Sequence, residues 1–208
     1  MSEARANGAS ASQKVTYPNL HSRLLLGGLF ERQYSIPEDP PWLFEQAGRF
    51  IERWLLNIDL SDICVDRPVF LLGLPRSGTT MVQDLCCTHP ELAYITNAMH
   101  QFPGCFCGIE KLRKWFHLDV SGERYLGDSV PVSVGSPNEG LQFWAKWFDW
   151  DACSPEYHPR SPEEYSPQEI ADIHTLIRRV IWCFGKPWRR FFSKNPAAVT
   201  DLDRLQHF

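Results

Sequence analysis

The stretch Arg67-Pro-Val-Phe-Leu-Leu-Gly-Leu-Pro-Arg-Ser-Gly-Thr-Thr80 decides the fold of this 208-residue chain. An apolar strand, Val69 to Leu74, leads directly into a turn bounded by glycines and then into a helix. Gly73 and Gly78 let successive backbone N–H groups converge, and the helix that begins near Gly78 directs the positive end of its dipole at the same point. The stretch therefore predicts a binding site for an anionic ligand such as phosphate.

The charge at this turn distinguishes it from a nucleoside triphosphate site. Its spacing matches the ATP-binding loop G-x-x-x-x-G-K-[ST], but Thr79 stands where that motif has lysine. The positive charge has moved to Arg76, whose planar guanidinium can bind two oxygens at once, whereas the lysine of the ATP loop acts as a point charge. The plainer alternative is a glycine-rich turn with a solvated arginine.

The loop Pro75-Arg76-Ser77-Gly78-Thr79-Thr80 resembles the phosphosulfate-binding loop of the sulfotransferases. The resemblance implies an α/β fold, a three-layer P-loop nucleotide-binding fold with a parallel sheet. It also implies that 3′-phosphoadenosine 5′-phosphosulfate is the co-substrate and that no metal is needed. In the family, Arg76 would contact the sulfuryl end of this donor, and the turn from Ser77 and Gly78 to Thr79 and Thr80 would hold its 5′-phosphate.

Composition is typical of one globular domain with a real core. The chain is 43% hydrophobic, with a formal net charge of −4 and a pI near 6.0, so it lacks the basic field of nucleic-acid-binding proteins. Its seven cysteines form no C-x-x-C pair and have no matching histidine spacing for zinc. We therefore expect reduced thiols, no metal and no nucleic-acid partner.

The amino-terminal segment predicts a tail rather than a targeting signal. Residues 1–16 are rich in Ser, Ala, Gly and Asn and contain no apolar run of the kind a signal peptide needs. The short leucine cluster that follows, Leu24 to Leu26, is too brief to span a bilayer. We expect a disordered tail over residues 1–16, a single domain over 17–208, no membrane span and a cytoplasmic protein.

The remaining pattern alternates helices and strands. A helix is expected from Pro41 onward, packed against the sheet by its aromatic face, and another after the loop with a buried face of Met81, Val82 and Leu85. Leu92 to Ile95 and Trp188 to Ser193 are predicted strands, the first of them parallel to the strand at Val69.

Two further helix starts follow from capping signals. Ser166-Pro167-Gln168-Glu169 is a capping box, and the helix it opens carries isoleucines, leucines and valines on one face until Gly185. Asn138 is an expected N-cap, which would place Glu139 in the first turn of a helix.

Glu139 and His100 are the candidate general bases. Glu139, in Ser136-Pro137-Asn138-Glu139, is similar to an acidic helix start of bacterial sulfotransferases, although Gly140 and Leu141 replace the further acidic residues of that motif. A first-turn carboxylate that only complements the helix dipole is the alternative for Glu139. His100 follows the strand that ends at Ile95, where ligands of parallel sheets bind, and ranks second.

Lys194 is the second candidate cation of the site. It follows the strand Trp188 to Ser193, and its place before Asn195-Pro196 resembles the family's lysine that approaches the bridging oxygen of the donor. A histidine two residues further on, which some members use, is replaced by Pro196. The alternative for Lys194 is an ordinary surface charge.

The resemblance extends from Pro41 to Phe208, and the family continues beyond that point into elements that bind the donor's 3′-phosphate. We therefore expect residues 17–208 to be an incomplete sulfotransferase-like domain, the amino-terminal part of a longer enzyme. We expect this chain to be prone to self-association. The predicted reaction is sulfuryl transfer to a hydroxyl or amine of a small-molecule, lipid or carbohydrate acceptor. The alternatives are an inactive anion- or partner-binding remnant, or a P-loop kinase, for which a terminal-phosphate cation and an acidic Mg²⁺ ligand are missing.

Overall fold

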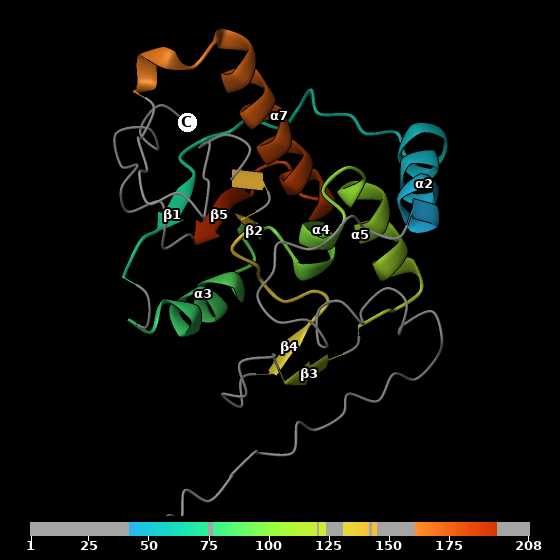
Figure 1. The fold of residues 1–208 in the computed structure, drawn as a ribbon, viewed down its shortest axis with the longest axis horizontal. Coiled ribbons are helices and arrows are strands. Elements are labelled where there is room, and N and C mark those ends of the chain that lie inside the picture. The colour runs from blue at the N-terminus through green and yellow to red at the C-terminus, as the bar shows by residue number, and fades with distance from the viewer. Residues whose placement is uncertain are drawn as a thin grey trace, which may run out of the picture.

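A computed structural model describes residues 42–74, 77–119, 121–123, 131–141, 143–144 and 161–194 of the chain (Figure 1). The helices of this part are α2 (Trp42–Phe50), α3 (Thr79–Cys87), α4 (Asn97–Gln101), α5 (Phe106–Trp115) and α7 (Pro167–Cys183). The π-helical turn η1 (Ile51–Leu55) continues α2, and the 3₁₀ turn η2 (Pro162–Glu164) precedes α7. The expected tail over residues 1–16 and the helix after Pro196 lie outside the described residues.

A three-stranded parallel sheet forms the centre, as predicted. Its strands are β1 (Val69–Leu71), β2 (Leu92–Tyr94) and β5 (Arg190–Lys194), in the order β1-β5-β2. The strand that comes last in sequence therefore inserts between the first two and pairs with both in parallel. A separate antiparallel pair joins β3 (Ser121–Glu123) to β4 (Pro131–Ser133). The α/β class and the parallel sheet are confirmed.

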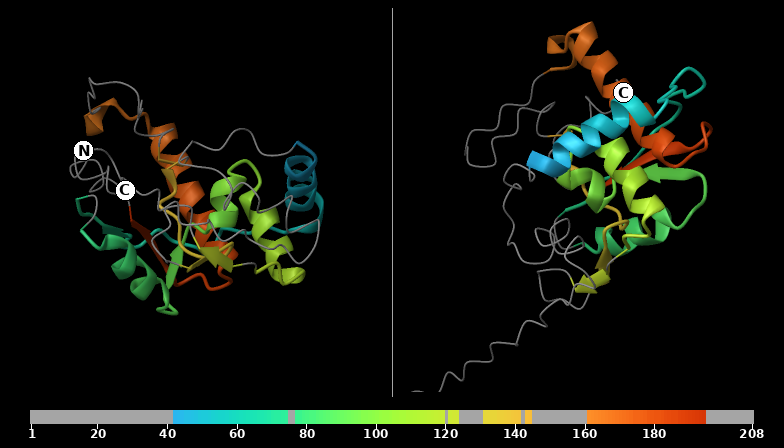
Figure 2. Two further views of the ribbon diagram at one scale, coloured as in Figure 1. Left: turned by 60° about the horizontal axis from the view of Figure 1, so that its bottom comes forward. Right: turned by 90° about the vertical axis from the view of Figure 1, so that its right-hand side faces the viewer.

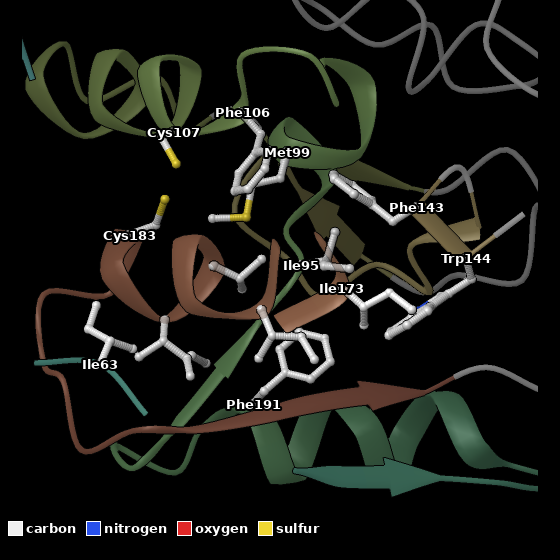
Figure 3. Packing of buried hydrophobic residues seen from close by; sticks show 14 residues of the cluster. Ile63, Ile95, Met99, Phe106, Cys107, Phe143, Trp144, Ile173, Cys183 and Phe191 are labelled. Carbon is white, nitrogen blue, oxygen red and sulfur yellow. The ribbon is translucent and has the colours of Figure 1, made fainter. Parts of the chain in front are cut away.

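Helices cover both faces of the sheet, and the main core lies on the α7 side. Figure 1 shows α3 on the opposite side of the sheet from α7, and both helices contact β2 and β5. Figure 3 shows the buried cluster between the sheet, α7 and α5, where Phe191 of β5 packs below Ile173. Phe70, Phe191 and Trp144 meet edge to face with ring centroids 6.1–6.3 Å apart. Burial of such apolar surface is the main stabilising term.

The buried face of α3 is not the one predicted. Met81 and Leu85 are 75% and 72% exposed, and the only buried residue of the helix is Gln83. Thr80, Gln83 and Cys87, spaced three and four residues apart, form the stripe turned toward the sheet. Because Gly78 fixes the start of the helix and Thr80 faces β5, the apolar residues turn outward. The orientation of α3 thus follows the loop rather than the hydrophobic pattern.

The predicted packing of the Pro41 helix against the sheet is also wrong. The left view in Figure 2 places α2 at the edge of the described part, on the side of α5, and the two helices are in contact. Gly48 allows the close approach, since a Cβ there would lie 2.6 Å from the Cys105 sulfur. Trp42, Leu43 and Phe50 remain largely exposed. The aromatic periodicity identified the helix correctly, but periodicity alone does not say which element the helix meets.

The capping box of α7 is confirmed. The Ser166 hydroxyl accepts the Glu169 N–H, and the Glu169 carboxylate accepts the Ser166 N–H at 2.8 Å. Ile173, Ile177, Val180 and Ile181 form the buried face, and Gly185, with φ +71°, follows the last turn. None of the described helices is long and apolar enough to cross a membrane.

A buried charge network joins α5 to the end of β2. The Glu110 side chain is fully buried and accepts hydrogen bonds from Arg113 and, at 3.2 Å, from the Thr96 hydroxyl. Arg113 also pairs with Asp119. Thr96 caps α4 through its side chain and forms a β-bridge with Pro137. Glu110 therefore stabilises the chain at Thr96, just after the end of β2.

We predict that Glu110→Gln lowers the free energy of unfolding by about 1.5–3 kcal/mol, because the buried Glu110 carboxylate accepts charge-assisted hydrogen bonds from Arg113, and its loss leaves that arginine, among the described residues, with only the exposed Asp119 as an anionic partner. Glu45→Gln is the matched control, since Glu45 also pairs with an arginine of its own helix at 2.6 Å, but that arginine is 54% exposed. The control should cost less than about 1 kcal/mol. Urea unfolding of both variants measures the difference, and equal costs would contradict this account.

Candidate active site at the carboxyl edge of the sheet

The candidate site lies around Lys194, the last residue of the central strand β5. Lys194 is only 3% exposed, and its register partner in β1 is Leu71. Its ammonium donates to the Glu139 carboxylate in a short ion pair and lies 3.4 Å from the Thr80 hydroxyl. Since the carboxyl ends of parallel strands meet at one edge, three segments distant in sequence converge here. Three of the predicted site residues are thus neighbours.

The turn before α3 is described from Ser77 onward. Gly78, with φ +80°, is the N-cap of α3, and its carbonyl accepts the Met81 N–H at 3.1 Å. The Ser77 hydroxyl donates to the Leu74 carbonyl at 2.6 Å. A side chain at Gly73 would collide with Thr79, whose methyl carbon would lie 2.6 Å from the added Cβ. The helix amino terminus is therefore open toward solvent at Ser77 and Gly78, while Arg76 lies outside the described residues.

The segment that carries Glu139 differs from the prediction. The chain becomes helical at Leu141, and the Gly140 carbonyl accepts the first helical N–H groups, from Phe143 and Trp144. Gly140, with φ +69°, is the residue before this helix, so Glu139 precedes the helix instead of occupying its first turn. Asn138 caps the turn itself, because its side chain accepts the Gly140 N–H at 2.8 Å. The partner that the structure gives the Glu139 carboxylate is the Lys194 ammonium.

This segment is fixed to the end of β2 by hydrogen bonds. Asn138 donates its N–H to Ile95 at 2.8 Å and its side-chain amide to Asn97 at 2.7 Å. Asn97 donates its own amide to the Ser133 carbonyl at 2.8 Å. On the other side, the Gln83 amide of α3 reaches the Asn138 carbonyl at 3.4 Å. Glu139 is thus held on a loop that contacts both neighbouring elements.

A buried hydrogen bond also links the two halves of the ion pair. Trp144, which follows Glu139 in the chain, is 1% exposed and donates its indole N–H to the Ser193 hydroxyl at 3.1 Å. Ser193 directly precedes Lys194. The segments that bear Glu139 and Lys194 are therefore fastened to each other as well as paired through their charges.

His100 lies in α4 and does not join this cluster within the described residues. Burial lowers the pKa of His100 to about 4, so the imidazole is neutral at pH 7. Its buried Nδ1 has no hydrogen-bond partner there. A neutral imidazole can accept a proton, but a pKa this low makes it a weak base at neutral pH.

The described cysteines and acids offer no obvious metal centre. Among the residues that the structure covers, no group of three or more His, Cys, Asp or Glu is placed to hold a metal ion. The six described cysteines are free, and the thiols of Cys107 and Cys183 face each other between α5 and α7 (Figure 3). Burial raises the pKa of the Cys183 thiol, which therefore stays protonated. Cys153 lies outside the described residues.

The sequence analysis did not identify three side-chain amides of the site. Gln83 and Asn97 were not named, and Asn138 was named only as a helix cap, not as a link to the end of β2. Gln83 sat in a helix whose apolar residues suggested another buried face. Asn97 follows a short strand and belongs to no motif that the sequence analysis used. The sequence held a weak signal for Gln83. It lies on the same helix face as Thr80, and a buried polar side chain there needs a hydrogen-bond partner.

Fold and site together define an α/β protein with a glycine-capped helix terminus and a buried lysine at the carboxyl edge of a parallel sheet. A family model described as the sulfotransferase family matches residues 68–208, more than half of the chain. The chain therefore belongs to the sulfotransferase family, whose members transfer sulfuryl groups. No curated protein and no solved structure matches it.

We predict that His100 makes the protein less stable in acid. Since the pKa of His100 is about 4 in the folded chain and near 6.5 when unfolded, the unfolded state binds one more proton between these values. Stability from this group is complete above pH 6.5 and is lost as the pH falls toward 4. From pH 7.5 to 5.0 the native protein should lose about 2 kcal/mol more than His100→Leu.

Urea unfolding at the two pH values measures this difference, because the other titrating groups cancel between variants. His117→Asn, at an exposed histidine, is the control and should behave as the native chain does. An identical pH dependence in the native protein and His100→Leu would contradict the assignment.

Proposed function

We propose that the protein transfers the sulfuryl group of 3′-phosphoadenosine 5′-phosphosulfate to a hydroxyl or amine of a small-molecule acceptor. The observation that carries this proposal is the position of the Lys194 ammonium. It lies between the Thr80 hydroxyl of the anion-binding helix and the Glu139 carboxylate. A cation there can touch the donor's phosphate end and the reacting group at once. The family membership supplies the reaction class.

The donor's 5′-phosphate would bind at the amino terminus of α3, through the N–H groups of Gly78, Thr79 and Thr80 and the hydroxyls of Thr79 and Thr80. The Ser77 N–H is bonded to the Leu74 carbonyl at 3.2 Å. The helix dipole and convergent N–H groups favour an anion there. Arg76, one residue before this turn, would bind the sulfuryl oxygens in a bidentate manner. Lys194 would bind the oxygen that bridges sulfur and phosphorus.

The transfer would proceed by in-line displacement. The acceptor oxygen or nitrogen attacks sulfur while the bond between sulfur and the bridging oxygen breaks. The acceptor's proton passes to the Glu139 carboxylate, and the bridging oxygen leaves on adenosine 3′,5′-bisphosphate. Lys194 and Arg76 stabilise the negative charge on the leaving and sulfuryl oxygens, a role that Mg²⁺ fills for ATP in kinases.

The ion pair has a consequence for the order of events. Without donor, the Lys194 ammonium is occupied by the Glu139 carboxylate. An ammonium has three N–H donors, so a bridging oxygen can recruit one of them and weaken the hold on Glu139. Donor binding would thereby release the carboxylate to accept a proton. We infer that the donor binds before the acceptor.

Glu139 is favoured over His100 as the base for geometric reasons. Glu139 is one quarter exposed and contacts Lys194, so an acceptor can approach it beside the leaving oxygen. The imidazole of His100 is buried and outside this contact within the described chain. A general base must lie within hydrogen-bond reach of the proton that it removes.

The donor assignment predicts that adenosine 3′,5′-bisphosphate binds at the turn from Ser77 to Thr80 and that Arg76→Lys impairs transfer. A lysine keeps the charge but loses the two-point contact, so the rate should fall about tenfold or more while the turn still binds phosphate. Crystals soaked with the bisphosphate, together with calorimetric titration, locate the ligand. An empty turn with the ligand elsewhere, or undiminished transfer by Arg76→Lys, would overturn the assignment.

The base assignment predicts that Glu139→Gln reduces turnover about a hundredfold or more, because proton removal is lost. Donor affinity should change little or rise, since Lys194 no longer has to leave a carboxylate. His100→Leu is the comparison and should retain most of the turnover. Release of labelled sulfate from ³⁵S-labelled donor, with water as acceptor, measures the rates. If His100→Leu is the crippling change instead, the base has been assigned wrongly.

A further inference from the structure

We propose that Asn138 is a positioning residue that fixes the Glu139 carboxylate opposite Lys194. This inference rests on the proposed role of Glu139 as the base. Asn138 does not touch Lys194 in any described contact, and no chemistry is assigned to its neutral side chain. Its effect on the reaction would pass entirely through the residue that follows it.

The hydrogen bonds of Asn138 reach three elements at once. Its N–H donates to Ile95 after β2, its side-chain amide donates to Asn97 of α4, and its carbonyl accepts from Gln83 of α3. Its side-chain oxygen accepts the Gly140 N–H. The residues on both sides of Glu139 are therefore held, which restricts the backbone of Glu139 itself.

Gly140 allows this arrangement because it can adopt a positive φ of +69°. A Cβ at this position would lie 2.5 Å from Ile95, so the backbone sits directly against the residue that Asn138 also contacts. The turn at Asn138 and Gly140 thus packs against Ile95, just after the end of β2. A carboxylate placed by such a turn has little freedom to move away from Lys194.

The hydrogen bonds of Asn138 differ from those on an exposed surface because their partners are buried. Asn97 is 8% exposed, so its side-chain oxygen would lose its donor without replacement by bulk water if the Asn138 side chain were removed. The buried Gln83 amide bonds the main-chain carbonyl of Asn138 and would keep this partner. The bonds themselves carry no net charge. They therefore do not weaken when a strongly anionic donor enters, whereas the Lys194 and Glu139 pair does.

The test compares four proteins: the native chain, Asn138→Ala, Glu139→Gln and the double variant. Hydrolysis of ³⁵S-labelled donor with water as acceptor supplies the rate. Asn138→Ala should lower the rate at least tenfold when Glu139 is present, because a displacement of about 1 Å can cost about a hundredfold. In the Glu139→Gln background the same change should cost less than twofold, since there is no base left to position.

Two controls separate positioning from loss of structure. Asn57→Ala, at an exposed asparagine outside the site, should leave every rate unchanged. Asn138→Ala should change the affinity for adenosine 3′,5′-bisphosphate by less than about twofold in both the native and the Glu139→Gln backgrounds, because the anion-binding turn is untouched. Asn138→Ser keeps an oxygen that can accept the Gly140 N–H but cannot reach Asn97, and should fall between the native chain and Asn138→Ala.

A spectroscopic readout does not depend on turnover. In protein labelled with ¹³C-glutamate, the Glu139 carboxyl resonance is identified by its loss in Glu139→Gln. Asn138→Ala, or Asn138→Ser if the alanine variant does not fold, should shift this resonance, and Asn57→Ala should not. An unmoved resonance, or an equal rate loss in both backgrounds, would overturn the positioning role. If the native chain neither binds the bisphosphate nor hydrolyses the donor, the proposed function fails, while a shifted resonance would still show that Asn138 places Glu139.

Discussion

The arrangement of the segments around the site depends on one buried ammonium group. Lys194 is 3% exposed at the end of the central strand, and transfer of an ion into such a place costs several kcal/mol unless partners replace water. Glu139 supplies the opposite charge and Thr80 a nearby hydroxyl. Both must be delivered to the carboxyl edge from other segments. The orientation of α3 and the path of the loop before Leu141 follow from that requirement.

The outward-facing apolar residues of α3 show how this constraint competes with hydrophobic burial. Turning Met81 and Leu85 toward the sheet would bury their apolar surface, and this burial would stabilise the fold by roughly 1.5–3 kcal/mol for each side chain. The same rotation would carry Thr80 and Gln83 away from Lys194 and Asn138. Gly78 fixes the start of α3 and Thr80 contacts Lys194, so the helix keeps the orientation that these contacts require. Polar contacts at the site outweigh the burial of two apolar side chains.

Much of this architecture could be predicted from the sequence, because its signals are local. The glycine-bounded loop, the capping box at Ser166 and the apolar strands at Val69 and Leu92 each depend on neighbouring residues. Which helix face packs inward, and where α2 lies, depend on distant contacts that no short window contains. The insertion of β5 between β1 and β2 is of the same kind. Lys194 and Glu139 could be named as candidates from motifs, but their contact spans 55 positions and needed the fold.

Placement and charge are handled by different groups in this site. The loop that carries Glu139 is held by amides, backbone groups and the indole of Trp144, all uncharged. The charged network of Glu110 and Arg113 lies further back, behind Thr96, where it secures α5 to the end of β2. A phosphosulfate donor carries several negative charges, which would disturb any scaffold that depended on ion pairs near the loop. Because these supports are neutral, the proposed exchange of partners by Lys194 and Glu139 would leave the backbone around the pair in place.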